Sequence, residues 1–449
     1  MKRVIFLSAT ICLCLLPACK DDESGNGTAP MPIQECTIEP ISGGAIIYYT
    51  IPSDRNIMYV MAEYKRNGKQ YVERSSAHNN WLTIEGFNTS DPVKAKLYTV
   101  NKNEVRSDSA LTVNFIPKES PIGMAFKSLK ILTGFLGVVA YWDNPTRTEL
   151  GVRLMIDSVD RKGKVHWVEK NMYFSRLASE RKAFRGFDTL TYTFAISLTD
   201  KWGNISDTAK HTCKPFFERM TPKPFSTRFW DPANNPPKVP FDQNTHLNTT
   251  VTFSRMSDGV TVDPPNQGGA NSWLTEARSD RQAMFTLDLQ RKFRLSRMVL
   301  WPRTGHRDWN IEPWIHLYTV NNVLKFEIWG TDVPDNEWPL SDRGYWLHEF
   351  SLNAPTFEPD VPISDRTFRD DWQYMGFFEV PRYDKMGYPG EVQLALRNLG
   401  WEFDFDPDKN PVRYIRFFVR ETDKGAPTPN AVFQICELSI FGNDLIPQK

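Results

Sequence analysis

One segment, residues 301–316, places three tryptophans among charged and amide side chains. A sugar ring has an apolar face of C–H bonds and a rim of hydroxyl groups. An exposed Trp offers a flat surface to that face, and Arg, Asp and His offer donors and acceptors to the rim. The segment therefore predicts a carbohydrate-binding loop, with contacts from Trp309, Trp314, Arg303, His306 and Asp308. The alternative is a loop whose tryptophans pack internally and whose charges are solvated.

A second candidate site is the Asp258-Gly259 turn, where a carboxylate could help to bind calcium through oxygen ligands. Asp263 and Asn266 follow within the same loop and could complete such a site. A turn aspartate without metal is the alternative. The seven histidines have no metal-ligand spacing, so structural calcium bound near Asp258 is the one cofactor that we consider.

The sequence holds no convincing catalytic motif. His306-Arg307-Asp308 matches three letters of a kinase loop, but no glycine-rich phosphate loop precedes it. His-Glu-x-x-His, Cys-x-x-Cys and Gly-x-Ser-x-Gly patterns are absent from the sequence. Asp370 and Asp371 could supply half of a glycosidase pair, although adjacent residues tend to point apart. We therefore expect a protein without catalytic residues and keep a glycosidase as the weaker alternative.

The first 18 residues predict an export signal. A positively charged start precedes the apolar run 4–16, which is shorter than the 20 or so residues that span a bilayer. Leu16-Pro17-Ala18-Cys19 resembles a lipobox, in which the cysteine is acylated and begins the mature chain. We expect Cys19 to anchor the protein in a membrane, because two or more acyl chains hold a protein stably.

Residues 19–32 are polar and small, which predicts a flexible tether behind the anchor. The acidic cluster 21–23 resembles the surface-export signal of Bacteroidota lipoproteins, although a solvated linker would have a similar composition. The resemblance implies an outer-membrane, cell-surface location. The membrane leaflet that holds the anchor is not evident from these residues.

Composition favours an all-β chain of several domains. The 449 residues are enough for two to four cores, and Phe, Trp and Tyr make up 13% of the chain. Lysine plus arginine equals aspartate plus glutamate at 54 each, so nothing indicates nucleic-acid binding. Besides Cys19, the mature chain holds Cys36, Cys213 and Cys436, for which we expect no structural disulfide, with Cys436 buried.

Two related modules are indicated by matches about 100 residues apart. Alternating apolar and polar residues predict strands such as 110–116 and 190–199. The matched segments are 44–49 with 137–142, 86–89 with 186–189, and 101–102 with 200–201, in the same order along the chain. Length and turn spacing predict immunoglobulin- or fibronectin-type sandwiches over residues 33–118 and 119–218.

The remaining unit, residues 223–446, has β-type runs at 283–289, 295–301, 325–330, 414–420 and 431–442. Residues 331–379 are rich in Asp, Pro and Trp, and we interpret them as a long insertion. Its aromatic residues could extend a binding face or cover the sheet, and covering is favoured. They are Trp338, Trp346, Trp372 and Tyr374.

This last unit resembles the discoidin, or coagulation-factor type C, β jelly roll. The resemblance rests on an ordered set of segments, which are 256–259, 272–275, 285–289, 295–300, 325–330, 412–417 and 436–442. Gln290 stands where that family has a glycine after Asp-Leu. The whole mature chain is similar to a three-part Bacteroidota lipoprotein encoded in polysaccharide-utilisation loci. That type has two sandwich modules of unassigned function, followed by a discoidin-like domain.

The resemblance implies a non-catalytic surface protein that binds a polysaccharide or oligosaccharide through its C-terminal domain. It also implies association with an outer-membrane transporter complex. A protein-binding adhesin or scaffold lipoprotein is the main alternative, because fold alone does not decide between these functions. The identity of the glycan and the oligomeric state are not evident from the sequence.

Overall fold

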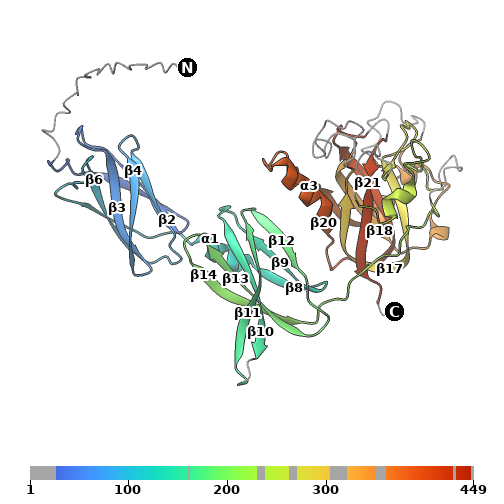
Figure 1. The fold of residues 1–449 in the computed structure, drawn as a ribbon, viewed down its shortest axis with the longest axis horizontal. Coiled ribbons are helices and arrows are strands. Elements are labelled where there is room, and N and C mark those ends of the chain that lie inside the picture. Colours follow the sequence, from blue (N-terminus) through green and yellow to red (C-terminus); the bar gives the residue numbers. More distant parts are fainter. Residues whose placement is uncertain are drawn as a thin grey trace, which may run out of the picture. The chain divides into compact units, whose positions relative to one another are not determined.

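The computed structural model describes residues 27–159, 162–229, 238–261, 271–303, 321–348, 361–427 and 431–445 (Figure 1). The chain forms two compact units. One comprises 1–130, 141–181 and 195–210, and the other comprises 131–140, 182–194 and 211–449. The described sheets consist of antiparallel strands, with parallel pairing confined to isolated bridges, and the all-β prediction is confirmed.

The first module is a sandwich of a three-stranded sheet, β1-β2-β5, and a four-stranded sheet, β4-β3-β6-β7. Ile47, Val60, Leu97 and their neighbours form one buried cluster between these sheets. The strand β4 has a mostly exposed pattern, as expected at a sheet edge. The strands are β1 (Cys36–Ile41), β2 (Gly44–Tyr49), β3 (Tyr59–Arg66), β4 (Lys69–Ser76), β5 (Trp81–Glu85), β6 (Val93–Val100) and β7 (Leu111–Phe115).

The next segment forms a four-stranded sheet, β11-β10-β13-β14, and a three-stranded sheet, β12-β9-β8. A short helix, α1 (Pro121–Ser128), precedes them; the Ser120 side chain caps it by accepting from Gly123 N. The strands are β8 (Lys130–Gly134), β9 (Gly137–Asp143), β10 (Leu150–Val159), β11 (Val165–Ser175), β12 (Ser179–Phe184), β13 (Tyr192–Asp200) and β14 (Ile205–Cys213).

The matched segments form the same corner in both modules. Phe87 N donates to Gly43 O at 3.0 Å, and Phe187 N donates to Leu136 O at 2.9 Å. The glycine before each phenylalanine has a left-handed backbone, with φ of 93° and 103°. The third match, 101–102 with 200–201, is a side-chain turn. Asn101 Oδ1 accepts from the amides two and four residues later, and Asp200 Oδ1 does the same. The sequence repeat therefore reflects shared backbone geometry.

The C-terminal domain is built on a sheet ordered β15-β23-β17-β21-β18-β19, with β20 also paired to β17. The first part of β17 pairs with β21, and its second part pairs with β23 and β20. The elements are β15 (Arg219–Met220), β16 (Trp273–Leu274), β17 (Met284–Trp301), β18 (Val323–Thr331), α2 (Phe368–Asp371), β19 (Gln373–Glu379), α3 (Gly390–Leu399), β20 (Trp401–Asp404), β21 (Val412–Thr422), β22 (Gln434–Ile435) and β23 (Glu437–Asn443).

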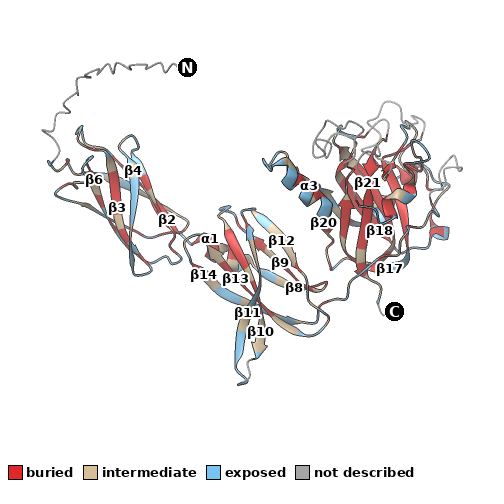
Figure 2. Cartoon of the chain, in the orientation of Figure 1, coloured by how far each residue is buried: buried red, intermediate tan, exposed pale blue. Residues whose placement is uncertain are grey.

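Both faces of β21 are buried, which Figure 2 shows as an almost continuous red strand. Ile415, Phe417 and Val419 belong to the main core, whereas Tyr414 and Phe418 belong to a second, largely aromatic cluster. This second cluster includes Trp338, Trp346 and Trp372, each less than a tenth exposed. These tryptophans of the segment interpreted as an insertion therefore cover the sheet, as the sequence analysis favoured.

Two expectations about this domain need correction. Residues 373–379, which we counted with the insertion, form the sheet strand β19. The runs 283–289 and 295–301 are not two strands, because β17 continues through both with an irregularity between Asp288 and Phe293. The helices α1, α2 and α3 were not predicted from the sequence. No described helix is long and apolar enough to cross a membrane.

Candidate functional site

Four of the five residues expected to contact a sugar, Trp309, Trp314, His306 and Asp308, lie outside the described residues, as does Cys19. The structure does describe both ends of the loop that carries them. We call Trp301–Arg303 together with Asn321–Asn322 the loop base. It lies between the end of β17 and the start of β18.

The side-chain amide of Asn322 joins the two ends of the loop. Its Oδ1 accepts from Arg303 N at 2.9 Å, and its Nδ2 donates to Arg303 O at 3.0 Å. Asn322 is fully buried. An amide that bonds both the backbone N–H and the backbone C=O of one residue imitates a neighbouring antiparallel β-strand, so the two ends are held in register.

Asp423 holds the other side of the loop base. Its two carboxylate oxygens accept from Asn321 N at 2.8 Å and from Asn322 N at 3.0 Å. Asn321 O in turn accepts from Gln434 N at 2.8 Å. The base is thus tied to β22 and to the segment that follows β21, as well as to its own strands.

A buried arginine connects the loop base to helix α3. The guanidinium of Arg397 donates to Pro302 O from Nε at 3.1 Å and from Nη2 at 2.6 Å. Trp301 Nε1 donates to Asn398 O at 3.3 Å, which adds a second contact with the helix. Arg397 is completely buried, so this contact is protected from solvent.

The fifth predicted residue, Arg303, is half-buried in the described structure. Its Nη1 lies 3.4 Å from Gln434 Oε1, a long hydrogen bond. Gln434 Nε2 is itself hydrogen-bonded to the Ser272 hydroxyl. Arg303 therefore stands at the loop base, beside a chain of polar side chains that continues into the domain.

Helix α3 buries polar side chains and exposes apolar ones (Figure 2). The polar residues Gln393 and Arg397 are buried, and Gln393 Nε2 donates to Tyr388 O at 2.7 Å. Several apolar side chains of the helix and the turn before it are exposed instead. We call them the α3 apolar face: Met386, Tyr388, Val392 and Leu399, of which Leu399 is 75% exposed.

The turn at Asp258 is occupied by protein donors. Asp258 Oδ1 accepts from Val260 N at 2.9 Å, and Oδ2 lies 3.3 Å from Arg255 Nη1. Within the described residues no group of three metal-ligating side chains occurs, while Asp263 and Asn266 lie outside them. The described contacts fit the turn interpretation of Asp258.

A buried carboxylate lies next to this turn. Glu437 Oε2 accepts from Gly259 N at 3.1 Å, and Oε1 is paired with the ammonium of Lys223. Burial raises the pKa of Glu437 to about 7, although Lys223 and the Gly259 amide lower it. The Lys223 ammonium is thus paired with Glu437, the buried carboxylate next to the Asp258 turn.

Asp370 and Asp371 both have structural partners. Asp370 Oδ2 accepts from Thr367 N at 2.8 Å and closes a capping box at α2, and these bonds lower the pKa of its carboxyl. Asp371 accepts from the Tyr345 hydroxyl at 2.9 Å. Both carboxylates are therefore engaged in local structure.

The residues that hold the loop base, Asn322, Asp423 and Arg397, were not predicted from the sequence. Asn321-Asn322 directly before a strand was a usable signal, because asparagine side chains often bond to nearby backbone. Arg397 lies 95 residues from Pro302, and nothing local in the sequence indicates this contact.

Three family models match consecutive parts of the chain, and each describes a domain of unknown function. They are DUF4959 over residues 30–117, DUF5126 over 118–224 and DUF5000 over 265–442. A comparison with curated proteins gives no match.

Among solved structures, the chain is similar to a SusE-like protein at 19% identity and a TM-score of 0.36, over 72% of this chain and 100% of that one. It is also similar to the chicken interferon gamma receptor alpha chain, at 11% identity and a TM-score of 0.18, over 42% and 99% of the two chains. A two-domain fibronectin type III segment of chicken tenascin is similar at 12% identity and a TM-score of 0.19, over 42% of this chain and 99% of that one. At TM-scores this low, the similarities carry no argument about function.

Proposed function

We propose that the protein is a non-catalytic, lipid-anchored protein that captures a polysaccharide at the cell surface. Acylated Cys19 would hold it in the outer membrane, and Trp309 and Trp314 would stack on sugar rings. Arg303, His306 and Asp308 would bond to the hydroxyl rim. Captured polysaccharide would then stay near degrading enzymes and an outer-membrane transporter complex.

The loop base is the observation that supports this proposal most. Asn322, Asp423 and Arg397 together fix both ends of the tryptophan-bearing segment through side-chain hydrogen bonds. A binding loop on a rigid support loses less conformational entropy when its ligand binds. Many anchored copies acting on one polymer would add avidity to weak single sites.

The test is retention on polysaccharide affinity gels, with Trp309→Ala and Trp314→Ala compared with the wild type. We expect both variants to migrate as if no polysaccharide were present, with melting temperatures close to the wild-type value. Trp81→Ala is the matched control, because Trp81 is 45% exposed on β5 of the first module. Wild-type retention in both loop variants would reject this site.

The α3 apolar face favours a second candidate function, that of a protein-binding scaffold. Exposed Met386, Val392 and Leu399 lie on one helix and its preceding turn, where a partner with an apolar surface could bury them. Burial of such side chains contributes roughly 1.5–3 kcal/mol each. Arg397, on the buried side of the same helix, donates to Pro302 O of the loop base.

Val392→Ser combined with Leu399→Ser tests the scaffold function in outer-membrane pull-downs. A stoichiometric partner that is lost in this variant, with polysaccharide retention intact, would favour the scaffold over glycan capture. Val72→Ser combined with Leu190→Ser is the control, since both residues are exposed in other parts of the chain. Equal recovery from the two double variants would reject the α3 apolar face as a docking surface.

A further inference from the structure

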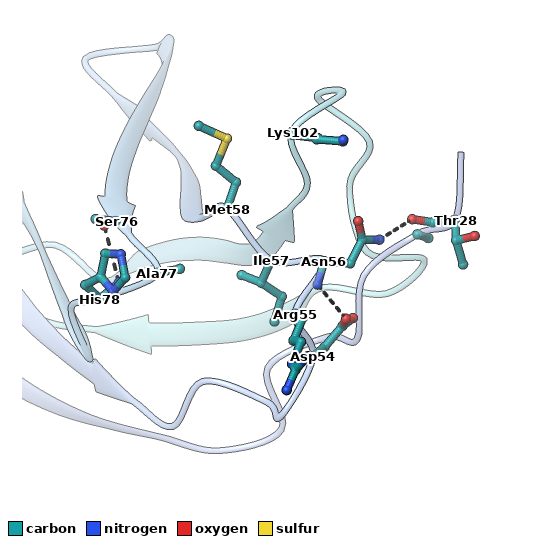
Figure 3. Close-up of a pocket in the computed structure, with 11 residues that line it drawn as sticks. Thr28, Asp54, Arg55, Asn56, Ile57, Met58, Ser76, Ala77, His78 and Lys102 are labelled. Carbon is teal, nitrogen blue, oxygen red and sulfur yellow. Dashed lines mark hydrogen bonds between the residues drawn. The ribbon is translucent and has the colours of Figure 1, made fainter. Parts of the chain in front are cut away.

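The first module contains a cavity of about 840 Å³ at the point where the described chain begins (Figure 3). Thr28 and Ala29 form one side of it, and residues 54–58, residues 76–78 and Lys102 form the rest. Arg55, His78 and Lys102 reach it from three separate segments. We call it the first-module cavity.

The frame of this cavity is fixed by hydrogen bonds. Asp54 Oδ2 accepts from Met31 N at 2.8 Å, and Oδ1 accepts from Asn56 N at 2.9 Å. Thr28 O accepts from Asn56 Nδ2 at 2.8 Å and from Asn101 Nδ2 at 3.1 Å. Asp54, the acidic residue among those that line the cavity, therefore uses both oxygens to hold backbone amides.

The basic side chains of the cavity have no such partners. Within the described residues, no carboxylate forms an ion pair with Arg55, His78 or Lys102. The other three arginines of residues 33–118 are engaged. Arg106 pairs with Glu63 at 2.7 Å, and Arg66 and Arg74 lie over tyrosine rings. The two cations Arg55 and Lys102 at one concave site favour an anionic ligand.

The position of the cavity indicates which anion is close at hand. Thr28 follows Cys19 by nine residues, and nine extended residues span at most about 32 Å. An anchor at Cys19 would therefore keep the cavity within this distance of the lipid headgroups. Phosphate groups are the common anions of such a surface, and Arg and Lys both bind them well.

We propose that the first-module cavity binds a phosphate group of the membrane surface through Arg55 and Lys102, with His78 beside them. This contact would hold the first module against the bilayer, as a second attachment next to the lipid. The proposal rests on the anchoring of Cys19 in the proposed function, but not on glycan binding by the C-terminal domain.

The experiment uses the mature chain with Cys19→Ser. This variant lacks the acyl anchor, so any vesicle binding reports the affinity of the protein surface itself. Co-sedimentation is measured with vesicles of phosphatidylcholine, with and without phosphatidylglycerol. We expect binding to the anionic vesicles that weakens at high salt, because screening shortens the reach of surface charges. In Arg55→Ala with Lys102→Ala, binding should fall roughly thirtyfold, at about fivefold for each cation removed.

Lys69→Ala combined with Lys118→Ala is the control, because both lysines are exposed in the first module and neither lines the cavity. Equal losses in the two double variants would show non-specific attraction and overturn the proposal. Inorganic phosphate serves as a second probe by calorimetry. Phosphate binding that needs Arg55 and Lys102, without vesicle binding, would identify free phosphate as the source and overturn the membrane contact.

An acidic polysaccharide that binds through Arg55 and Lys102 while vesicles do not would also overturn the proposal. Retention on the polysaccharide gels of the proposed function is measured for the same double variant. We expect it to match the wild type, since the cavity and the loop base lie in different units. The two proposals can therefore fail separately.

Discussion

The sharpest test of the loop base is Asn322→Asp, which changes one group of a buried side chain and keeps its shape. Oδ1 can still accept from Arg303 N, but the NH₂ group that donates to Arg303 O is replaced by an oxygen. Two acceptors then face each other without a proton between them. Asp423 lies on the other side of Asn322 and adds a second negative charge.

The expected cost follows from these contacts. A buried acceptor left without its donor costs about 1–3 kcal/mol, and burying a charge adds to this. We therefore expect Asn322→Asp to lower the unfolding free energy of the C-terminal domain by about 3 kcal/mol. For a domain of this size, the melting temperature should fall by roughly 6–12 °C. Retention on polysaccharide gels should also weaken, because the loop ends separate more readily.

The loss should depend on pH in a defined direction. The ordinary pKa of an aspartate is about 3.9. The folded state raises the pKa of the introduced carboxyl, because its charged form faces Arg303 O and Asp423. The cost is therefore present above this raised pKa and is relieved below it, where the protonated carboxyl again donates to Arg303 O. The difference from wild type should shrink between pH 7 and pH 4.

Asn321→Asp is the matched control. It adds the same charge one residue earlier, at a position with φ of 63° that asparagine and aspartate both tolerate. Thermal unfolding of both variants at the two pH values gives the comparison. Similar melting temperatures for the two variants at pH 7, or a loss in Asn322→Asp that persists at pH 4, would refute the role assigned to the Asn322 amide.

Three further outcomes are expected. Gln290→Gly should stabilise the protein by up to about 1 kcal/mol and raise its melting temperature slightly, because Gln290 has φ of 66°. A melting temperature below that of the wild type would contradict this. The pKa of Glu437 is raised to about 7, so its stabilising effect is complete below pH 4.5 and is lost as the pH rises through 7. Glu437→Gln should flatten this decline between pH 5 and 8. Calcium should leave the melting temperature unchanged, because the Lys223 ammonium pairs with Glu437 beside Asp258. A higher melting temperature in the presence of calcium would instead support a calcium site at this turn.

Local patterns were enough to predict some of the sandwich strands. Leu111, Val113 and Phe115 alternate with polar residues, and the predicted strand 110–116 is found as β7, Leu111–Phe115. The edge strand β4 was missed because its residues are mainly exposed, so no apolar face marks it in the sequence. Strands with one buried face are therefore predictable, and edge strands much less so.

The aromatic cluster that covers the C-terminal sheet contains contacts that local sequence patterns do not predict. Arg416 belongs to β21, which was predicted as a strand, but its burial between Trp346 and Phe368 could not be foreseen. Its guanidinium pairs with Asp242, and burial lowers the pKa of Arg416 and raises that of Asp242. A fully buried ion pair depends on partners 174 residues apart, which local periodicity does not connect.

Helix α3 was also missed because contacts between distant residues determine which of its faces is buried. Its hydrophobic pattern is reversed, with Arg397 buried and Leu399 exposed, because Arg397 donates to Pro302 O and Gln393 donates to Tyr388 O. A leucine at 397 would leave Pro302 O without two of its donors. The helix therefore gives up apolar burial in order to hold the loop base, and its exposed side chains follow from that role. Glycan capture by the loop and protein contact through the α3 apolar face would both depend on Arg397.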